Sequence, residues 1–398
     1  MPDRQARGCY LNRSVLERFF ASHPVNALLA CSADSVFVAS GHRTWLDEKM
    51  LGWMASPSGD ETPRAGYAVV TAGGEIGLVA NAVVRADAQA RAPDCLMLFG
   101  RNQPHATPEA ALAALLREME LAHKTIAWEE QALGGNVKQA IIEFAPACTF
   151  IDGSITWRLL KTVKSADAIG ALREVSVVTE RALDESLPLW RERADPFAAR
   201  RRYMRVLAES GADFDHFAWG MRGGGVSVRV PPQERAGTLF FDAGARLDGF
   251  YSDTGLTLAH APCSFTDAQR YADALGVLNV GRVHLRAGER ASSAWQAMQD
   301  ASPDTALVAQ GHGLGTSIRE WPFFGPATDR CVRDGIGEYG IDQTLVEGMV
   351  VNLEVAGHWP DGSSVQVEQT FNIEAEGARL LAAQPREHTI NLAASPRS

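Results

Sequence analysis

Residues 240–255, FFDAGARLDGFYSDTG, have the pattern of two strands joined by a tight turn, yet they carry three acids among aromatic and small residues. Asp248-Gly249 is a favoured two-residue turn, because glycine tolerates a positive φ and aspartate is permissive. That turn pairs Gly244 with Asp253 and Asp242 with Gly255. Side chains alternate along a strand, so Asp242 and Asp253 are expected on one face as diagonal neighbours. Two such carboxylates repel unless a cation lies between them or one is protonated.

A second acidic pair lies in GMVVNLEVAGHWPDGSSVQVEQTFNIEAEGARLL, residues 348–381, where Glu354 and Glu368 each sit in an apolar, strand-like run. A two-residue turn at Asp361-Gly362 would put these glutamates on opposite faces of a hairpin. For both to face the same way, the connection needs an odd number of residues or a bulge. The sequence therefore predicts a longer loop or a bulge between residues 360 and 364.

His312 lies between the two acidic pairs, in QGHGLGTSIREWPFF, residues 310–324, and the glycines beside it allow a close backbone approach. Four carboxylates and one imidazole form a ligand set for two divalent cations such as Mn²⁺, Fe²⁺, Co²⁺ or Zn²⁺. Taken singly, a strand acid usually faces solvent, and a histidine beside glycine is usually structural. GHGLG also lacks the G-x-G-x-x-G spacing of a dinucleotide loop. The hypothesis of a metal site rests on the combination.

The composition is that of a soluble globular protein: 398 residues, 46% hydrophobic, 22% charged, with a formal net charge of -10. Such a charge argues against nucleic acid or an anionic membrane as the main partner. Six scattered cysteines without a C-x-x-C pair fit a reducing compartment. The N-terminus lacks the apolar core of a signal peptide, and no apolar run is long enough to span a membrane. We expect a cytoplasmic protein.

The pattern of elements predicts two domains. Strands expected at residues 26–40, 65–80 and 138–144, with a helix at 107–124 capped by Thr107, indicate an α/β domain over residues 1–160. Residues 161–398 begin with a helix capped by Ser165. Strands follow from about residue 217 to 255, then one helical region at 266–298, then strands from about 306. Segregated helices and antiparallel strands make the second domain, and the chain as a whole, α+β.

The order Asp, ten residues, Asp, then His in GHG, Glu after GMVVNL and Glu in VEQTFNIEAEGARLL resembles the pita-bread metallohydrolases. This family includes methionine aminopeptidase, prolidase, aminopeptidase P and creatinase. The resemblance covers residues 161–381. Residues 1–160 resemble, more weakly, the smaller α/β N-terminal domain of the prolidase-creatinase branch. The resemblance implies a C-terminal pita-bread catalytic domain and a homodimer. It also implies two metal ions bound by Asp242, Asp253, His312, Glu354 and Glu368, with Asp253 and Glu368 contacting both.

The chain departs from the family around this ligand set. Peptidases of the family carry a second histidine seven residues after the metal-binding one, where this chain has Arg319. Arginine stays protonated and cannot shuttle protons, although it can stabilise an oxyanion or bind a substrate carboxylate. The family's arginine two residues before the last metal glutamate is replaced by Gln366. Residues 221–237 lack the histidine that prolidase-like members place upstream of the first aspartate strand.

The resemblance implies a hydrolase that attacks a small amide, amidine or peptide-like substrate with a metal-bound hydroxide, with Glu354 relaying the proton and Arg319 polarising the leaving oxygen. One alternative is a lyase of the dimethylsulfoniopropionate-lyase type. Another is a non-catalytic pita-bread binding module, which metal content would distinguish. Five further residues are candidates for contact with the small-molecule or short-peptide substrate, although each also has a purely structural explanation: Trp45, His216, Arg222, Trp321 and His358.

Overall fold

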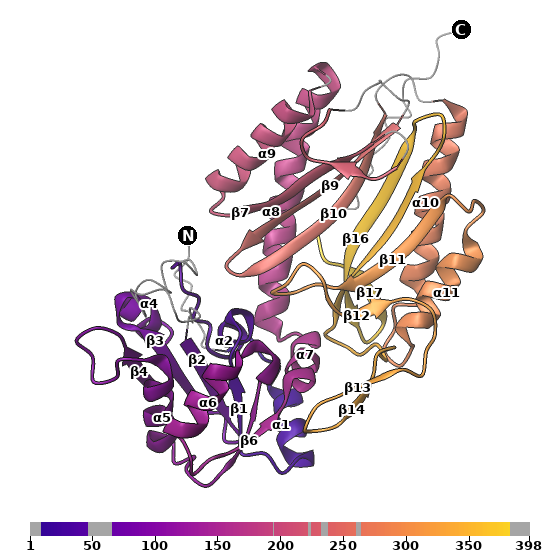
Figure 1. Ribbon diagram of the computed structural model, residues 1–398. Coiled ribbons are helices and arrows are strands. Elements are labelled where there is room, and N and C mark those ends of the chain that lie inside the picture. The colour runs from indigo at the N-terminus through magenta and orange to yellow at the C-terminus, as the bar shows by residue number, and fades with distance from the viewer. Residues whose placement is uncertain are drawn as a thin grey trace. The chain divides into compact units, whose positions relative to one another are not determined.

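The computed structural model describes residues 9–46, 66–193, 195–221, 224–231, 238–259 and 264–382 (Figure 1). The chain divides into two compact units. The N-terminal unit comprises Met1–Ser165 together with Cys331–Tyr339, and the C-terminal unit comprises Ala166–Arg330 and Gly340–Ser398. The first division lies close to the boundary expected between residues 160 and 161. In the part of the chain that is described, no helix is long and apolar enough to cross a membrane.

The N-terminal unit is built on a mixed six-stranded sheet with the strand order β4-β3-β2-β1-β5-β6. Its strands are β1 (Ala27–Ala30), β2 (Gly66–Thr71), β3 (Ile76–Asn81), β4 (Cys95–Phe99), β5 (Thr125–Trp128) and β6 (Thr149–Asp152). Its helices are α1 (Arg13–Ser22), α2 (Ala33–Ser40), α4 (Arg85–Gln89), α5 (Pro108–Glu118), α6 (Gly135–Phe144) and α7 (Ser154–Thr162), with short 3₁₀ turns η1 (Ala82–Val84) and η2 (Glu130–Ala132).

Of the strands expected in the N-terminal unit, one is right only in part and another is wrong. Residues 26–40 form a strand only as far as Ala30 and then turn into α2, because the Ser32 hydroxyl accepts a hydrogen bond from Ser35 N and caps a helix. Residues 138–144 belong to α6, whose buried Val137 and Ile141 are one helical turn apart. A short apolar run does not by itself distinguish a strand from the buried face of a helix.

The other N-terminal expectations are confirmed. Residues 65–80 form β2 and β3, joined by a turn. The Thr107 hydroxyl caps α5 by accepting a hydrogen bond from Ala110 N, and Pro108 occupies the first turn. The helix ends at Glu118, six residues before the expected end at Lys124.

The C-terminal unit combines helices with two antiparallel sheets of order β10-β9-β7-β8 and β12-β11-β15-β16-β17. Its helices are α8 (Ala166–Arg193), α9 (Pro196–Glu209), α10 (Phe265–Val283) and α11 (Ala291–Ala301). The first sheet holds β7 (Asp213–Gly220), β8 (Val226–Ser227), β9 (Thr238–Leu247) and β10 (Phe250–Ala259). The second holds β11 (Leu307–Gly313), β12 (Glu320–Phe324), β15 (Val350–His358), β16 (Ser364–Glu374) and β17 (Gly377–Leu380), while β13 (Cys331–Arg333) and β14 (Glu338–Gly340) pair separately.

The single helical region expected at residues 266–298 is two helices, α10 and α11. The segment between them includes Gly288 with a φ of +94°, a left-handed conformation that interrupts a helix. Helix α8 begins one residue after Ser165 and carries Asp167 in its first turn, as expected.

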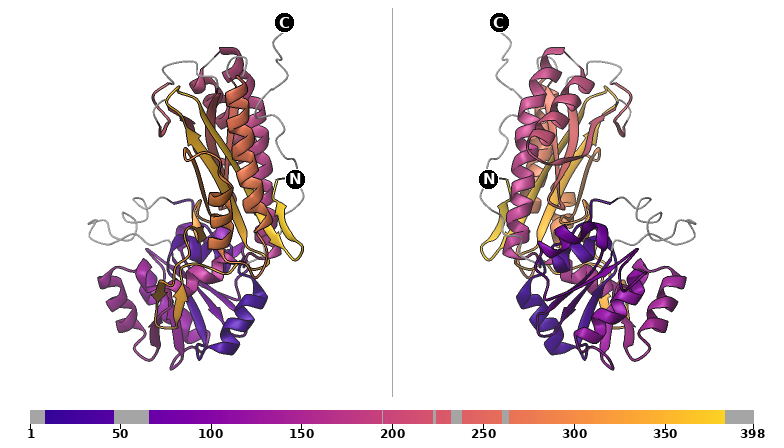
Figure 2. Two further views of the ribbon diagram at one scale, coloured as in Figure 1. Left: turned by 90° about the vertical axis from the view of Figure 1, so that its right-hand side faces the viewer. Right: turned by 90° about the vertical axis from the view of Figure 1, so that its left-hand side faces the viewer.

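The helices of the C-terminal unit pack on the outer faces of its two sheets (Figure 2). On α8, the Thr179 hydroxyl lies 2.6 Å from the Ser252 hydroxyl of β10. On α10, the absent side chain of Gly281 leaves room for Leu353 of β15. Residues next to Ser252 and Leu353 in sequence, Asp253 and Glu354, therefore face the opposite side, away from the helices.

The two sheets meet along β10 and β16. The Thr257 hydroxyl of β10 donates a hydrogen bond to Gln366 O and accepts one from Gln366 N, both at 2.8 Å. Gly255 lies against the Gln366 side chain, since a Cβ on Gly255 would come within 2.6 Å of it. This close approach brings the faces that carry the two acidic pairs together.

Both predicted hairpin registers are confirmed. In β9 and β10, Asp253 pairs with Gly244 and Gly255 with Asp242. The connecting residues Asp248 and Gly249 have φ values of +50° and +91°, as a two-residue turn of this kind requires. Between β15 and β16 the loop runs over residues 359–363, so Glu354 pairs directly with Glu368.

The turn at Asp248-Gly249 yields a stability prediction. Gly249→Ala places a Cβ on a residue with a φ of +91°, and we expect the free energy of unfolding to fall by about 1 kcal/mol. Gly276→Ala, in an open position on α10, serves as the control and should raise it by roughly 0.5–1 kcal/mol. Urea denaturation measures both, and an unaltered midpoint for Gly249→Ala would contradict this account of the turn.

Candidate metal centre

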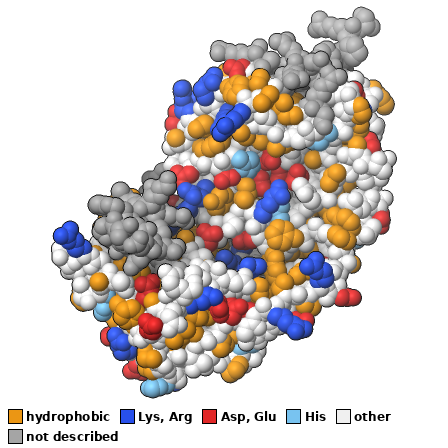
Figure 3. Space-filling model, viewed as in Figure 1, with side chains coloured by type: hydrophobic (Ala, Val, Ile, Leu, Met, Phe, Trp, Pro, Cys, Tyr) orange, Lys and Arg blue, Asp and Glu red, His pale blue; other side chains and the backbone are white. Residues whose placement is uncertain are grey.

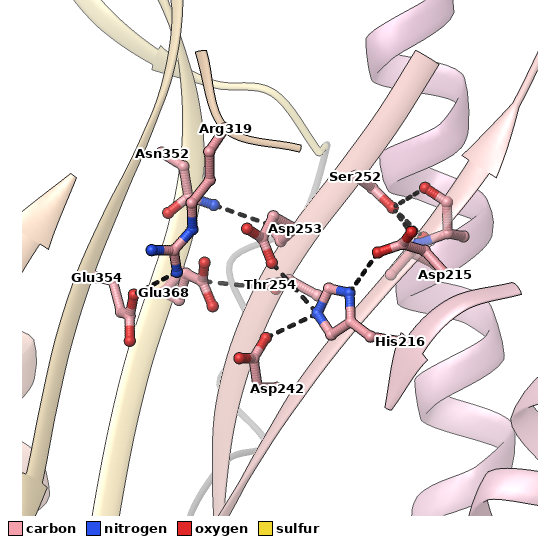
Figure 4. Close-up of polar contacts among 12 residues, drawn as sticks. Asp215, His216, Asp242, Ser252, Asp253, Thr254, Arg319, Asn352, Glu354 and Glu368 are labelled. Atoms are coloured by element: carbon pink, nitrogen blue, oxygen red, sulfur yellow. Dashed lines mark hydrogen bonds and ion pairs between the residues drawn. The ribbon is translucent and has the colours of Figure 1, made fainter. Parts of the chain in front are cut away.

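Four carboxyl groups converge between the two sheets of the C-terminal unit (Figure 4). Asp242 and Asp253 come from β9 and β10 and lie diagonally on one face of that hairpin. Glu354 and Glu368 come from β15 and β16 and face each other across that pair. Figure 3 shows acidic side chains gathered with histidine on the face of the C-terminal unit that is turned toward the viewer.

His312 joins this cluster from β11, and its geometry suits a metal ligand. The ring is 2% exposed, and Nδ1 lies 3.0 Å from the carbonyl oxygen of Gly313. Burial lowers the pKa of His312, so the ring is neutral, with its proton on Nδ1, where it donates to that carbonyl. Among the described residues, Nε2 has no hydrogen-bond partner, although Asp253 Oδ2 is 3.5 Å away. A buried imidazole lone pair facing carboxylates is the arrangement that a divalent cation completes.

His216 of β7, which the sequence analysis gave only as a candidate for substrate contact, also lies in the cluster. Its Nε2 lies 2.9 Å from Asp242 Oδ1 and 3.5 Å from Asp253 Oδ1, and its Nδ1 lies 2.7 Å from Asp215 Oδ2. Burial alone would lower the pKa of His216, but its hydrogen bonds with Asp215, Asp242 and Asp253 raise that pKa to about 12. Without a metal ion, a proton therefore occupies the space between this ring and the two aspartates.

Three of these carboxyls have raised pKa values, because they are buried and lie close to one another. Burial raises the pKa of Asp253, and it raises the pKa of Glu354 to about 7. Burial and the neighbouring Asp253 carboxylate hold the pKa of Glu368 well above its ordinary value. Amide side chains partly compensate, since Gln310 Nε2 donates to Glu354 at 2.6 Å and Gln366 Nε2 donates to Glu368 at 3.0 Å. Even with a protonated His216, the four carboxyls outnumber the positive charges close to them.

The residues present fit divalent cations. Two groups have ligand atoms that all lie within 4.8 Å of one another: one contains His216, Asp242 and Asp253, and the other contains Asp253, His312 and Glu368. Oxygen donors with a minority of imidazole suit Mn²⁺, Fe²⁺, Co²⁺ or Zn²⁺. Asp253 belongs to both groups, so its carboxylate is placed to contact two cations.

Arg319 lies immediately before β12, close to the cluster. Its Nη2 is 3.9 Å from Glu354 Oε2, and its side chain is 52% exposed. At that distance and exposure the ion pair is weak, so the guanidinium remains available to another anion. The structure therefore brings together Asp242, Asp253, His312, Glu354, Glu368 and Arg319, as well as His216.

The remaining predicted substrate residues are placed as follows. Trp45 belongs to the N-terminal unit, where its side chain is 68% exposed, and Arg222 lies outside the described residues. Trp321 is half-buried in β12, and its carbonyl oxygen approaches Gly313 closely. His358 lies four residues after Glu354 on the same side of β15, with its ring 5.4 Å from that of Phe240. These four assignments remain predictions.

Three supporting residues were missed from the sequence: Asp215, Gln310 and Asn352. Asn352 Nδ2 donates to the backbone carbonyl of Asp253 at 3.0 Å and to Thr370 Oγ1 at 3.2 Å, which fixes β10 against β15 and β16. Gln310 could have been found, because it precedes His312 by two residues and therefore shares its side of the strand. Asp215 had no such signal, because its role depends on where the His216 ring lies.

The fold and this cluster define a class, the pita-bread hydrolases, and in this chain a smaller unit precedes the pita-bread unit. Residues 170–375, just over half of the 398, match the family model described as "Metallopeptidase family M24". The chain belongs to this family.

The chain is also similar to individual proteins. A Bacillus subtilis (strain 168) protein named "Putative dipeptidase YkvY" is 20% identical over 303 residues, which is 71% of this chain and 77% of that protein. A Xaa-Pro dipeptidase from Bacillus anthracis is similar in structure with a TM-score of 0.68 and 19% identity, covering 95% of this chain and 98% of that one. For a prolidase from Thermococcus sibiricus the TM-score is 0.69 with 15% identity, and the coverage is 94% and 97%. These likenesses show the fold.

The carboxyl cluster predicts a pH-dependent stability for the metal-free protein. A carboxyl with a raised folded-state pKa contributes its full stability below its unfolded pKa, and that stability is lost as the pH rises through the folded value. For Glu354 this window runs from 4.5 to about 7. We expect the free energy of unfolding of chelator-treated protein to fall from pH 5 to 8, by up to roughly 1.4 kcal/mol per pH unit for each such carboxyl.

The control for this prediction is Glu354→Gln, which removes one of the raised carboxyls but keeps its shape. In denaturant unfolding at pH 5, 6.5 and 8, this variant should lose less stability with rising pH than the unaltered protein. A pH dependence as steep as that of the unaltered protein would show that Glu354 is not the source.

Proposed function

We propose that this chain is a metal-dependent hydrolase that cleaves the amide bond of a short peptide of the Xaa-Pro type. In this proposal Asp242, Asp253, His312, Glu354 and Glu368 hold two divalent cations. One observation carries it: the buried Nε2 of His312, which lacks a hydrogen-bond partner among the described residues, faces Asp253 and Glu368. The dipeptidase and prolidase names of the similar proteins support the choice of substrate.

The bound cations would lower the pKa of a water molecule and polarise the substrate carbonyl. The chain's own residues supply the remaining steps. Gln310 orients the Glu354 carboxyl with a short hydrogen bond, and in the absence of metal burial raises the pKa of Glu354 to about 7, so a basic carboxylate is present near neutral pH. Glu354 is therefore placed to take the proton that the attacking water loses and to pass it to the leaving nitrogen.

Arg319 is proposed to bind the C-terminal carboxylate of the substrate. A guanidinium presents paired donors that match a carboxylate, and more than half of this side chain is exposed. A free dipeptide carries a carboxylate close to its scissile bond, so the group that replaces the family's histidine favours short substrates. Trp45, His216, Arg222, Trp321 and His358 are further candidates for substrate contact.

We also propose that the chain acts as a cytoplasmic homodimer, with residues 1–160 and 161–398 as its domains. The described cysteines are all free thiols, which suits a reducing compartment. The exposed Trp45 indole is the kind of side chain that a second subunit covers.

Metal analysis joined to a substrate panel tests the proposed function. We expect the purified protein to carry divalent metal, to lose peptide cleavage after chelation, and to regain it with Mn²⁺, Co²⁺, Zn²⁺ or Fe²⁺. The panel contains Xaa-Pro dipeptides, N-acyl amino acids, creatine-like amidines and dimethylsulfoniopropionate. Turnover of dimethylsulfoniopropionate alone would replace the hydrolase with a lyase, and a metal-free protein without any turnover would favour a binding module.

The role of Arg319 is tested by removing either the charge of Arg319 or the charge of the substrate's C-terminal carboxylate. Arg319→Ala should lower kcat/KM for a Xaa-Pro dipeptide by roughly 10–100-fold, the cost of one charge-assisted hydrogen-bonded pair. The same variant should leave cleavage of the C-terminally amidated peptide nearly unchanged. Arg286→Ala, which removes an exposed charge elsewhere, is the matched control. Equal losses on the free and amidated peptides would exclude carboxylate binding by Arg319.

A further inference from the structure

We propose that His216 is a sixth metal ligand, which supplies the nitrogen donor to the cation held by Asp242 and Asp253. The inference rests on the metal-binding part of the proposed function and goes beyond the five-residue ligand set. It assigns one imidazole to each cation, His216 on one side of Asp253 and His312 on the other.

The distances around Asp253 support this arrangement. Asp253 Oδ1 lies 3.5 Å from His216 Nε2, and Asp253 Oδ2 lies 3.5 Å from His312 Nε2. Asp242 Oδ1 lies 2.9 Å from His216 Nε2. Two donor atoms that share one cation at bond lengths of about 2.0–2.2 Å lie roughly 2.9–3.5 Å apart, depending on the angle between the bonds. Asp242 Oδ1 and Asp253 Oδ1 therefore both lie at the distance from His216 Nε2 that is expected between ligands of one cation.

The orientation of the ring is that of a metal-binding histidine. Asp215 Oδ2 lies 2.7 Å from Nδ1, so the proton on Nδ1 is donated to a carboxylate, and the Nε2 lone pair faces the cluster. Carboxylate–histidine–metal arrangements of this kind fix the tautomer and increase the basicity of the ligand. Because Nε2 faces the oxygens of Asp242 and Asp253, the three groups are compatible only when a proton or a cation lies between them.

The backbone is shaped to hold this ring. The pairing of β7 with β9 shifts register between Phe214 and His216, and such irregularities redirect side chains in a strand. Opposite His216 stands Gly244, where a Cβ would lie 2.4 Å from the ring's Cε1 and 2.6 Å from the carbonyl oxygen of Ser252. Glycine at this position leaves the space that the imidazole fills. A surface histidine would need neither feature.

A protonated His216 could instead take the place of one cation, held as an imidazolium between Asp215, Asp242 and Asp253. The two arrangements differ in metal content: a ligand gives two cations per chain, and an imidazolium gives one. They also respond oppositely to substitution, because removing a ligand weakens metal binding, whereas removing a competing positive charge strengthens it.

Cobalt binding to the full-length protein distinguishes these cases without reference to activity. Metal-free protein is titrated with Co²⁺ by calorimetry, and visible absorption records the coordination of each bound ion. We expect two Co²⁺ per chain in the unaltered protein. His216→Gln should weaken one of the two sites by 10-fold or more and change the absorption of that cobalt, while the second site is retained. His284→Ala, which removes a histidine bonded to Glu289 outside the cluster, is the matched control.

A second variant keeps the test valid if His216→Gln does not fold, which thermal unfolding of the metal-free protein will show. Asp215→Asn retains the shape of the side chain but weakens its hold on Nδ1. It should weaken the same site by roughly 10-fold. The inference would be overturned if neither variant changed Co²⁺ binding at either site. It would also be overturned if the unaltered protein bound one Co²⁺ per chain and His216→Gln bound two.

The inference and the proposed function can fail separately. Two bound Co²⁺ with the expected loss in His216→Gln, but no peptide cleavage, would overturn the proposed substrate and support His216 as a ligand. Peptide cleavage that depends on metal, with Co²⁺ binding unchanged in His216→Gln and Asp215→Asn, would support the proposed function and overturn the assignment of His216.

Discussion

The main physical constraint on the C-terminal unit is the repulsion among four carboxyl groups that its two sheets bring together. Helices cover the outer faces of both sheets, so Asp242, Asp253, Glu354 and Glu368 point into the space between the inner faces. Buried carboxylates at such distances are tolerated only as protonated acids or beside positive charge. The raised pKa values of Asp253, Glu354 and Glu368 express that cost in the metal-free chain. Divalent cations, as proposed, would convert the same repulsion into affinity, because each carboxylate would then have a cation beside it without being buried further.

Much of this arrangement could be predicted from the sequence, because it depends on short-range geometry. The turn at Asp248-Gly249 sets the register of one hairpin, and the alternation of side chains then places Asp242 and Asp253 on one face. The same alternation required an odd number of loop residues or a bulge between Glu354 and Glu368, and the structure has a five-residue loop there, residues 359–363. Strands 4–8 residues long with apolar side chains are less distinctive, which explains why α6 was mistaken for a strand.

The features of the site that could not be predicted from the sequence depend on contacts between distant segments. His216 reaches Asp242 because β7 shifts register and Gly244 lacks a side chain, and neither event leaves a local pattern. The proximity of Arg319 to Glu354 likewise depends on how the segment before β12 returns to β15. Asn352 was not singled out from the sequence, although its amide holds the backbone of Asp253 in place. Supporting residues of this kind become visible only when the strands are assembled.

The residues of the cluster differ in how much of each is exposed to solvent. Asp253, His312 and Glu368 are nearly inaccessible, and the carbonyl of Asp253 is fixed by Asn352 and Thr370. The side chains of His216 and Asp242 are 23% and 27% exposed, and that of Arg319 is 52% exposed. In the proposed function, a substrate would therefore meet the cluster from the more exposed side, that of Arg319 and Asp242. In the proposed function, an anionic group that enters from this side reaches a guanidinium before it meets the carboxylates. Arg319, in place of the histidine that the family's peptidases carry, would then favour substrates with a negative end close to the bond that is cut.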